Sequence, residues 1–427
     1  MRRQDFGLVA LVSFFGLLVM VGQGLASEAE WPRFRGPAGL GVGKGQAAPL
    51  TWSDSQNLRW KTPLPGAGSS SPVVWGGKVF VTCYSGRGSD LARQVVCVSR
   101  ETGEVLWQRD VANTRQEDAY RGFITEHGYA SNTPVTDGEQ VFVFLGKSGV
   151  VAYSMDGDEQ WRVDVGDESS NREWGSAASL TLYGDKLIVN SCEESQSIRA
   201  LDKATGAEAW KVESGRLELC YNTPTLAKDA TGRDELIVPT PGEVWSLNPD
   251  NGKLRWYATL PLGSNVSPSA VVEDGVAYLY GGRNPAGAMA VRLGGRGDVT
   301  DTHVLWTSRD SSYVATPVLY DGHLYWASDR GQAYCVDAAT GETVYRERLP
   351  VQMRGRPFYA SPVLSGDRFI VPSRYDGIFV FSASTDFKQL AVNRFDGDDS
   401  QFNATPALVD GDLLLRSDSY LYCVATE

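Results

Sequence analysis

A short motif that recurs along the chain restricts its possible folds more than any other feature. In the copy from Ala200 to Trp210, an apolar strand end leads into Asp202, and Thr205-Gly206 then reverses the chain. Glycine adopts the positive φ that closes a short hairpin, and an aspartate side chain can hydrogen-bond the turn amides. The gap of four residues between glycine and an aromatic side chain recurs at Gly103/Trp107, Gly157/Trp161, Gly206/Trp210, Gly252/Trp256 and Gly341/Tyr345. This spacing predicts a repeated unit of β-structure.

Each repeat contains four short strands. The first follows a Ser/Thr-Pro pair or a relative of it, with the prolines at Pro72, Pro134, Pro224, Pro268, Pro317, Pro362 and Pro406, while the third repeat has Ser176-Ala177-Ala178-Ser179 instead. The fourth strand carries the aromatic residue, which is Trp60, Trp107, Trp161, Trp210, Trp256, Trp306 or Tyr345. Because one such unit cannot bury its own faces, we expect these aromatic side chains to dock against the neighbouring unit.

The period of the repeat predicts a propeller. Four short strands in 40 to 50 residues are typical of a propeller blade, and the 368 residues from Trp60 to Glu427 divide into eight repeats of 46. The last repeat ends after its third strand, at 422–425, and an isolated strand at 58–60 can complete it and close the ring. The sequence therefore predicts an all-β, eight-bladed β-propeller of four-stranded antiparallel blades, closed by an N-terminal strand.

The N-terminus predicts export. Arg2 and Arg3 precede a mostly apolar run at 6–21, and small residues at 23–26 provide a cleavage site, as in a secretory signal peptide. An uncleaved membrane anchor is the alternative, although the run is short for a span of ~20 residues. We expect a signal peptide at 1–26, an arm at 27–57 and the propeller at 58–427. No cysteine follows the apolar run, so we expect a periplasmic or secreted protein without a lipid anchor.

Charge and cysteine usage exclude some classes of protein. The formal net charge is −12, which disfavours nucleic acid as a partner because phosphate contacts need clustered Lys and Arg. The six cysteines include no CxxC and no adjacent pair, so they do not form a disulfide framework. Cys97, Cys335 and Cys423 share one position of the repeat and are expected to be buried strand residues. We expect a monomer that does not span the membrane once the signal is cleaved.

The repeat resembles that of the pyrroloquinoline-quinone (PQQ)-like propeller family, whose docking motif reads Ala-x-Asp-x-x-Thr-Gly-x-x-x-Trp. The resemblance covers residues 58–427, and the Trp31-Pro32-Arg33-Phe34-Arg35-Gly36-Pro37 opening is similar to that of exported BamB-like proteins. Two branches of the family matter. The resemblance implies either a quinoprotein dehydrogenase, which holds PQQ with Ca²⁺, or a non-catalytic scaffold such as the outer-membrane assembly lipoprotein BamB.

The sequence departs from both branches. It lacks the adjacent cysteines that form a vicinal disulfide in alcohol-type quinoprotein dehydrogenases, and it is shorter than those enzymes. Their Ca²⁺ ligands and catalytic aspartate have no assignable counterparts, so no catalytic residue, metal ligand or cofactor is assigned here. PQQ remains an alternative without a quinone-site motif. The cysteine that anchors BamB to lipid is absent as well.

Two connections between blades carry candidate ligand-binding residues. The segment 121–129 contains Glu126 and His127, and the segment 171–176 contains Glu173 and Trp174. Two carboxylates and a histidine can do acid–base work or bind a metal. The alternative is a hydrogen-bonded cluster that plugs the mouth of the channel.

A third connection adds basic residues. Arg354 and Arg356 precede the seventh blade and, with Arg121, can face an anionic or sugar-like ligand that stacks on Trp174. The alternative is that arginine pairs with Glu126 and Glu173. The sequence leaves open whether the channel is lined by these residues or filled by residues 31–45.

Three functions follow as hypotheses. The first is a non-catalytic binding or scaffold protein of the cell envelope, with a protein or polysaccharide partner. The second is a PQQ-dependent oxidoreductase. The third is a carbohydrate-binding or carbohydrate-active propeller.

Overall fold

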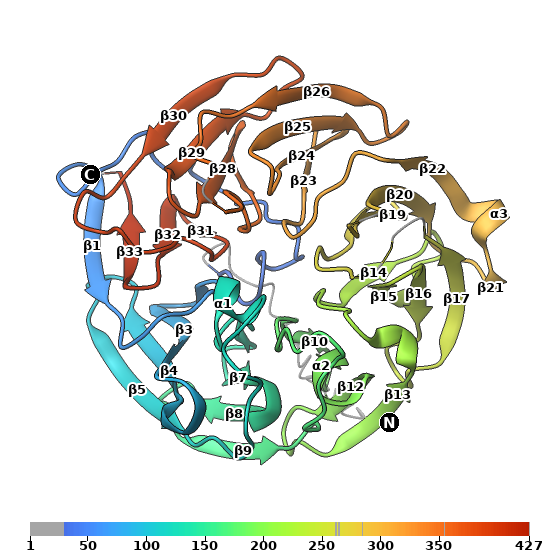
Figure 1. The fold of residues 1–427 in the computed structure, drawn as a ribbon, viewed down its shortest axis with the longest axis horizontal. Helices are drawn as coiled ribbons and strands as arrows, with labels where there is room; N and C mark the ends of the chain where they lie inside the picture. The colour runs from blue at the N-terminus through green and yellow to red at the C-terminus, as the bar shows by residue number, and fades with distance from the viewer. Residues whose placement is uncertain (1–29, 261–262, 264, 284, 354, 427) are drawn as a thin grey trace, which may run out of the picture.

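The structure is a computed structural model that describes residues 30–260, 263, 265–283, 285–353 and 355–426. Within these residues the chain forms eight antiparallel sheets around a central axis, and each sheet is one blade of a propeller (Figure 1). The predicted fold class is therefore confirmed. The expected signal peptide lies outside the described residues.

Blades 1 to 4 follow one another along the chain. Blade 1 is β2 (Val73–Trp75), β3 (Lys78–Ser85), β4 (Ala92–Ser99) and β5 (Val105–Val111). Blade 2 is β6 (Val135–Thr136), β7 (Gln140–Phe144), β8 (Val150–Ser154) and β9 (Glu159–Val163). Blade 3 is β10 (Thr181–Tyr183), β11 (Lys186–Ser191), β12 (Ser197–Asp202) and β13 (Glu208–Glu213). Blade 4 is β14 (Thr225–Lys228), β15 (Asp234–Thr240), β16 (Glu243–Leu247) and β17 (Leu254–Thr259), to which β21 (Gly297–Asp298) adds in parallel.

Blades 5 to 8 complete the ring. Blade 5 is β18 (Val271–Glu273), β19 (Val276–Gly281), β20 (Gly287–Arg292) and β22 (Val304–Ser308). Blade 6 is β23 (Val318–Tyr320), β24 (His323–Ala327), β25 (Gln332–Asp337) and β26 (Thr343–Arg348). Blade 7 is β27 (Val363–Ser365), β28 (Arg368–Ser373), β29 (Gly377–Ser382) and β30 (Gln389–Asn393). Blade 8 is β31 (Ala407–Val409), β32 (Asp412–Arg416), β33 (Tyr420–Val424) and β1 (Leu58–Pro63).

Short helical turns lie in the connections. The α-helical turns are α1 (Ile124–His127), α2 (Cys192–Ser195) and α3 (Thr300–His303), and the 3₁₀ turns are η1 (Gly88–Asp90), η2 (Gly146–Ser148) and η3 (Gly215–Leu217). None of the helices in the described part of the chain has the length and apolar character needed to cross a bilayer.

The two ends of the propeller sequence share the last blade. Strand β1 pairs antiparallel with β33, with Trp60 opposite Cys423 and Lys61 opposite Tyr422. The two strands lie side by side at the rim of the ring (Figure 1). An N-terminal strand therefore closes the circle, as the unfinished last repeat predicts, and removes an open sheet edge.

The repeated turn links each blade to the one before it. In blade 3, Asp202 Oδ1 accepts hydrogen bonds from the Thr205 amide at 2.9 Å and from its hydroxyl at 2.7 Å. The indole of Trp210 then donates to the Pro249 carbonyl in the turn of blade 4 at 3.0 Å. A Cβ on Gly252 of that turn would lie 2.6 Å from the Trp210 ring, so glycine leaves the space that the indole fills.

Four further indoles make the same contact with a carbonyl of the next blade. They are Trp60 with Arg100 at 2.8 Å, Trp107 with Met155 at 3.0 Å, Trp161 with Lys203 at 3.0 Å and Trp306 with Ala338 at 2.9 Å. Trp256 differs, because its indole donates to Glu235 Oε2 of its own blade at 2.8 Å. The next blade has no Asp-Thr-Gly turn at this point and carries β21 and α3 instead. Tyr345 packs edge-on against Phe387 of blade 7, with ring centroids 5.4 Å apart.

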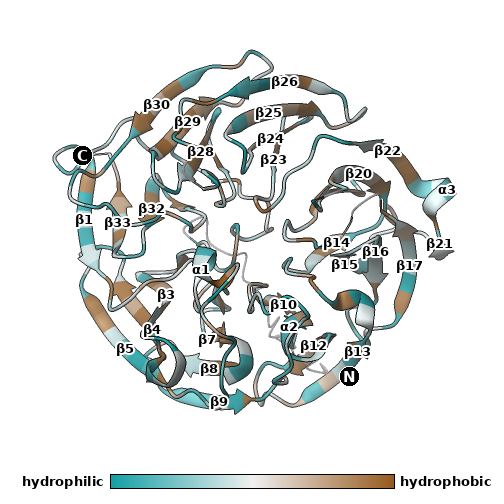
Figure 2. Cartoon of the chain, in the orientation of Figure 1, coloured by the Kyte–Doolittle hydropathy of each residue, from teal (hydrophilic) through white to brown (hydrophobic). Residues whose placement is uncertain are grey.

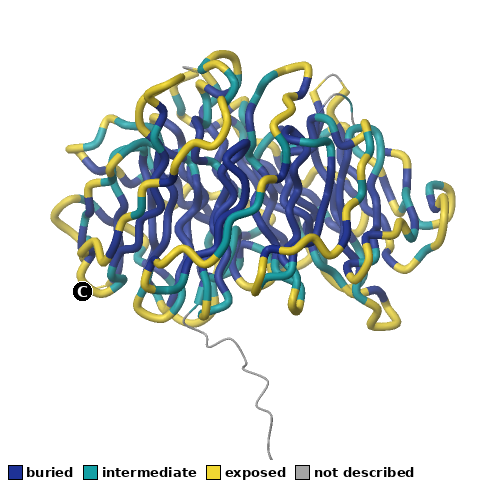
Figure 3. Tube along the Cα trace, turned by 90° about the horizontal axis from the view of Figure 1, so that it is seen from below, coloured by how far each residue is buried: buried dark blue, intermediate teal, exposed yellow. Residues whose placement is uncertain are grey.

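Packing between blades forms the core. Side chains on a middle strand such as β25 are mostly buried, whereas in the outer strand β26 only Tyr345 is buried and the other residues are exposed. Figure 2 shows hydrophilic residues along β26 and in the connections between strands. Seen from the side, buried residues fill the middle of the disc and exposed residues lie toward its two faces (Figure 3).

Residues 30–57, here called the arm, cross one end of the central channel. The Thr136 amide of blade 2 donates to the Pro32 carbonyl at 2.9 Å, and the arm then pairs with Leu364 of blade 7 through Val42. Between these contacts, the guanidinium of Arg35 is 1% exposed. It donates to five carbonyls at 2.6–3.2 Å, those of Gly39, Leu40, Thr316, Pro317 and Pro362. Burial lowers the pKa of Arg35 to about 9.

Candidate functional site

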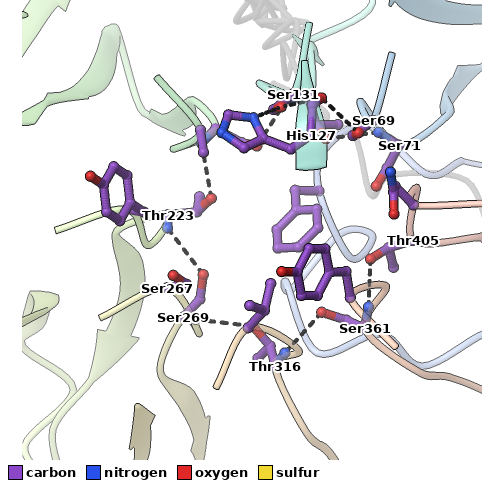
Figure 4. A pocket seen from close by; sticks show the side chains of 18 of the residues that line it. Ser69, Ser71, His127, Ser131, Thr223, Ser267, Ser269, Thr316, Ser361 and Thr405 are labelled. Atoms are coloured by element: carbon purple, nitrogen blue, oxygen red, sulfur yellow. Dashed lines mark hydrogen bonds between the residues drawn. The ribbon is translucent and has the colours of Figure 1, made fainter. Parts of the chain in front are cut away.

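One hydroxyl from each blade lies in a ring around the axis. The residues, here called the hydroxyl ring, stand at the start of each innermost strand and are Ser71, Thr133, Ser179, Thr223, Ser269, Thr316, Ser361 and Thr405. From Ser71 to Thr405, each backbone N–H donates to the hydroxyl oxygen of the next member at 2.9–3.1 Å. Figure 4 shows this chain of hydrogen bonds from Thr223 through Ser269, Thr316 and Ser361 to Thr405.

These hydrogen bonds leave the hydroxyl protons available. A serine or threonine hydroxyl that accepts from an amide still has one O–H to donate. Six of the eight members precede a proline, which holds the residue before it in the extended conformation. The repeated Ser/Thr-Pro pair is therefore the sequence signal for this ring. Sequence reasoning assigned the pair to the blade openings but did not assign the hydroxyls to a site.

The ring forms the waist of a cavity of about 160 Å³, here called the axial well. A second layer lies two residues earlier in each blade, because side chains alternate along an extended strand. Its members are Ser69, Ser131, Ala177, Tyr221, Ser267, Val314, Tyr359 and Asn403. Phe34 of the arm also lines the well. Arg33 contacts Thr181, two residues beyond Ser179, so the arm lies on the opposite side of the hydroxyl ring from the second layer and Phe34 closes that end.

Aromatic side chains gather at the other end of the well. Phe123 comes from the connection between blades 1 and 2, and Tyr313 from that between blades 5 and 6, on the opposite side of an eight-bladed ring. Their ring centroids are 6.3 Å apart, so Phe123 lies across the mouth. Trp174 packs on Phe123 with centroids 4.3 Å apart, and the Arg356 guanidinium lies 4.6 Å from the Phe123 centroid.

His127 lines the well and bonds to neutral groups. Its Nδ1 lies 2.6 Å from the Ser131 hydroxyl, and its Nε2 lies 2.9 Å from the Trp174 carbonyl. Figure 4 shows Ser131 beside the imidazole of His127. A carbonyl only accepts, so Nε2 carries a proton. Burial lowers the pKa of His127. The histidine is therefore neutral near pH 7, with Nδ1 facing a hydroxyl.

The two predicted carboxylates point away from the histidine. Glu126 accepts from Arg374 of blade 7 at 2.5 Å, and the Arg374 side chain is buried. Glu173 pairs with Arg121, and both side chains are exposed. The pairing of Arg121 with Glu173 is one that the sequence offered, whereas Arg374 was not singled out by sequence reasoning. Each carboxylate thus has its own arginine outside the well.

The remaining predicted residues lie at the mouth. Trp174 stacks on Tyr221 with centroids 6.1 Å apart and planes at 28°. Arg356 donates to the Tyr359 hydroxyl at 2.7 Å and lies 3.8 Å from Asp329. Arg354 lies outside the described residues. Of the predicted set, the structure therefore brings His127, Trp174 and Arg356 to the well or its rim, and their role in binding remains a prediction.

Two buried glutamates stand behind the wall of the well. Glu193 accepts from the Tyr221 hydroxyl at 2.5 Å and from the Ser170 amide at 3.1 Å, and burial raises its pKa. Its neighbour Glu194 is 2% exposed, and burial raises the pKa of Glu194 to about 8. The hydrogen bond from the Tyr221 hydroxyl to Glu193 fixes the orientation of the Tyr221 ring against the well.

The well does not fit a quinone held by Ca²⁺. The described residues that line it include no Asp, Glu, Lys, Arg or Cys. The six cysteines are buried and unpaired, and in the described ranges no three His, Cys, Asp or Glu side chains gather as metal ligands would. Its 160 Å³ is also smaller than the ~300–1,000 Å³ of most ligand pockets, while PQQ is a fused-ring quinone with several carboxylates.

Comparison with known proteins gives one family model and several solved structures with the same fold. A family model described as outer membrane protein assembly factor BamB matches residues 92–347 and 296–398. No curated protein sequence matches the chain.

Solved structures share the propeller. BamB from Moraxella catarrhalis superimposes with a TM-score of 0.60 at 16% identity, covering 86% of this chain and 98% of that one. The computationally designed protein Ika8 gives a TM-score of 0.55 at 10% identity, covering 85% and 99%. The quinohemoprotein alcohol dehydrogenase ADHIIG from Pseudomonas putida HK5 gives 0.51 at 11% identity, covering 84% and 76%. At these identities the likeness concerns the fold.

Proposed function

Because the chain belongs to the family of the outer membrane protein assembly factor BamB, we propose that it is a non-catalytic binding propeller of the cell envelope. The face that carries the axial well would hold its partner. The basic start and the apolar run near the N-terminus support export to this compartment.

The absence of a reactive set in the described lining of the well carries this proposal. Acid–base or nucleophilic catalysis needs an activated group within hydrogen-bond reach of a partner base or acid. His127 is neutral there and bonds to a hydroxyl and a carbonyl, while Glu126 and Glu173 are held by Arg374 and Arg121. These side chains favour holding a ligand over transforming it.

A basic cleft beside the well suggests the chemistry of the partner. The cleft has a volume of about 160 Å³ and shares Tyr313 with the well. Its charged lining residues are Arg283, Arg309, Arg330, Arg346, Asp310 and Asp329. Four arginines against two aspartates are unusual on a chain with a net charge of −12. Such a cleft attracts an anionic segment, so we propose a partner protein that presents acidic residues at the rim of the well.

Charge reversal in the cleft tests the proposal. The variant R309E/R330E is expected to weaken capture of the envelope partner at least tenfold, measured by chemical cross-linking to the purified chain in envelope extract. The control R292E/R296E makes the same change of charge at the far end of β20 and in the following loop, and is expected to capture as the wild type does. Equal capture by both variants would contradict the proposed binding face. Dye-linked alcohol oxidation after addition of PQQ and Ca²⁺ would contradict the absence of catalysis.

A further inference from the structure

We infer that the axial well binds one saccharide ring, a neutral six-membered ring that carries hydroxyl groups, seated on the hydroxyl ring and covered by Phe123. The inference deepens the proposed function, on which it rests in taking the same face as the binding face.

The volume of the well limits a ligand to a single ring. An engineered protein cavity of about 150 Å³ holds one benzene molecule. The axial well has about 160 Å³ and is closed at one end by Phe34 of the arm. A polymer therefore cannot thread through the channel. The well can accept only a free small molecule or the terminal unit of a chain.

The polarity of the waist selects hydroxylated ligands. Each hydroxyl from Thr133 to Thr405 accepts from a backbone amide and keeps its own proton to donate. A purely apolar ring would leave these buried donors without partners, which is unfavourable. A charged ligand would be buried without a counter-ion, because no Asp, Glu, Lys or Arg is among the described lining residues. A neutral ring with its own hydroxyls satisfies both conditions.

Near the mouth of the well, aromatic side chains that are held in position supply flat apolar faces. Tyr221 is fixed by Glu193 and stacks on Trp174, and the Tyr359 hydroxyl accepts from Arg356 at 2.7 Å. Binding to side chains that are already fixed avoids the entropic cost of ordering them. One face of a saccharide ring is lined by C–H groups, which pack on aromatic rings, while its hydroxyls reach the polar waist.

Phe123 controls entry to the well. It follows Gly122, whose φ of 60° places it in the left-handed region, and it precedes α1. Its contacts at the mouth are with Trp174, Tyr313 and Arg356. Phe123 therefore narrows the path by which a ligand reaches the hydroxyl ring from this side, and we expect it to slow exchange.

Calorimetry with simple sugars tests the inference. Methyl glycosides of glucose, galactose, mannose and N-acetylglucosamine are titrated into the full chain, and at least one is expected to bind. The variant A177W places a bulky ring in the second layer without removing a hydrogen bond, and is expected to abolish this binding. The variant T223V removes one member of the hydroxyl ring and is expected to weaken binding about threefold to tenfold. Its matched control, T225V, changes a threonine of the same segment whose hydroxyl bonds to the Ala270 carbonyl and which does not line the well.

The outcomes separate this inference from the proposed function. Binding by the wild type that A177W abolishes supports the well, and an oligosaccharide that binds more tightly than its terminal methyl glycoside identifies a glycan end as the source rather than a free sugar. No binding of any glycoside overturns the inference, as does binding that survives A177W. Binding of N-acetyltyrosinamide in place of the glycosides overturns it too, in favour of a peptide side chain. A wild type that captures its partner yet binds no sugar refutes this inference alone, whereas one that binds sugar yet captures no partner refutes the scaffold proposal alone.

Discussion

Replacing Glu194 by glutamine is expected to remove much of the pH dependence of stability between pH 5 and pH 8. Glu194 is 2% exposed, and burial raises its pKa to about 8, above the usual glutamate pKa of 4.5. Below pH 4.5 the carboxyl is protonated in both the folded and the unfolded state, and its contribution to stability is fully present. As the pH rises, the unfolded state ionises first, so stability is lost until the folded group ionises near pH 8.

The size of the effect follows from the shift in pKa. One unit corresponds to about 1.4 kcal/mol, so the shift of Glu194 amounts to about 5 kcal/mol between the two limits. Glutamine stays neutral throughout. The free energy of unfolding of E194Q should therefore exceed that of the wild type by several kcal/mol more at pH 9 than at pH 4.5.

Urea unfolding at pH 4.5, 6, 7.5 and 9 measures this difference. The control E342Q changes an exposed glutamate in the turn of blade 6 and should follow the wild type at every pH. Parallel curves for the wild type and E194Q would refute the reasoning. They would mean that Glu194 is ionised in the folded protein or reaches water.

Three further predictions concern a blade junction, the closure of the ring and the mouth of the well. Trp210→Ala should lower the free energy of unfolding by about 3–5 kcal/mol, because it empties the junction between blades 3 and 4, and an unchanged calorimetric Tm would contradict that packing. Asp412→Ala should lower the free energy of unfolding by about 3 kcal/mol, because the buried Asp412 carboxylate lies 2.9 Å from both Arg59 of β1 and Arg100 and so joins them. An unchanged midpoint of chemical denaturation would show that strand pairing alone closes the ring. Phe123→Ala should speed dissociation of a bound glycoside in stopped-flow fluorescence while Tm changes little, and an unchanged rate would remove Phe123 from the path.

The repeat made the fold readable from the sequence. Asp202, Gly206 and Trp210 each have a local reason to occupy their positions, and the same reasons recur in most blades, so the period alone predicts four-stranded units in a ring. The unfinished last repeat predicts how the ring closes. Trp256 shows where the pattern stops, because the docking partner of an indole is supplied by the next blade and blade 5 lacks the turn.

The site was harder to predict from the sequence, because it depends on which side chains point toward the central axis. Glu126 and His127 are neighbours in sequence, but successive residues on a helical turn do not face each other, and only His127 faces the well. The hydroxyl ring joins residues that are 44 to 62 positions apart in the sequence, each of which looks ordinary in its own blade. Phe34 reaches the well because Arg35 donates to three carbonyls of blades 6 and 7 at the end of the channel, and neither residue type signals that position.

A crystal structure of the chain grown with the tightest-binding methyl glycoside tests the central claim most directly. That claim is that the arm closes one end of the channel and leaves a hydroxyl-lined well at the other. The account predicts a sugar ring within hydrogen-bond distance of the Thr223 and Ser269 hydroxyls, with Phe34 beneath it and Phe123 turned or closed above it. An empty well with the sugar bound elsewhere, or an arm displaced from the channel, would contradict it.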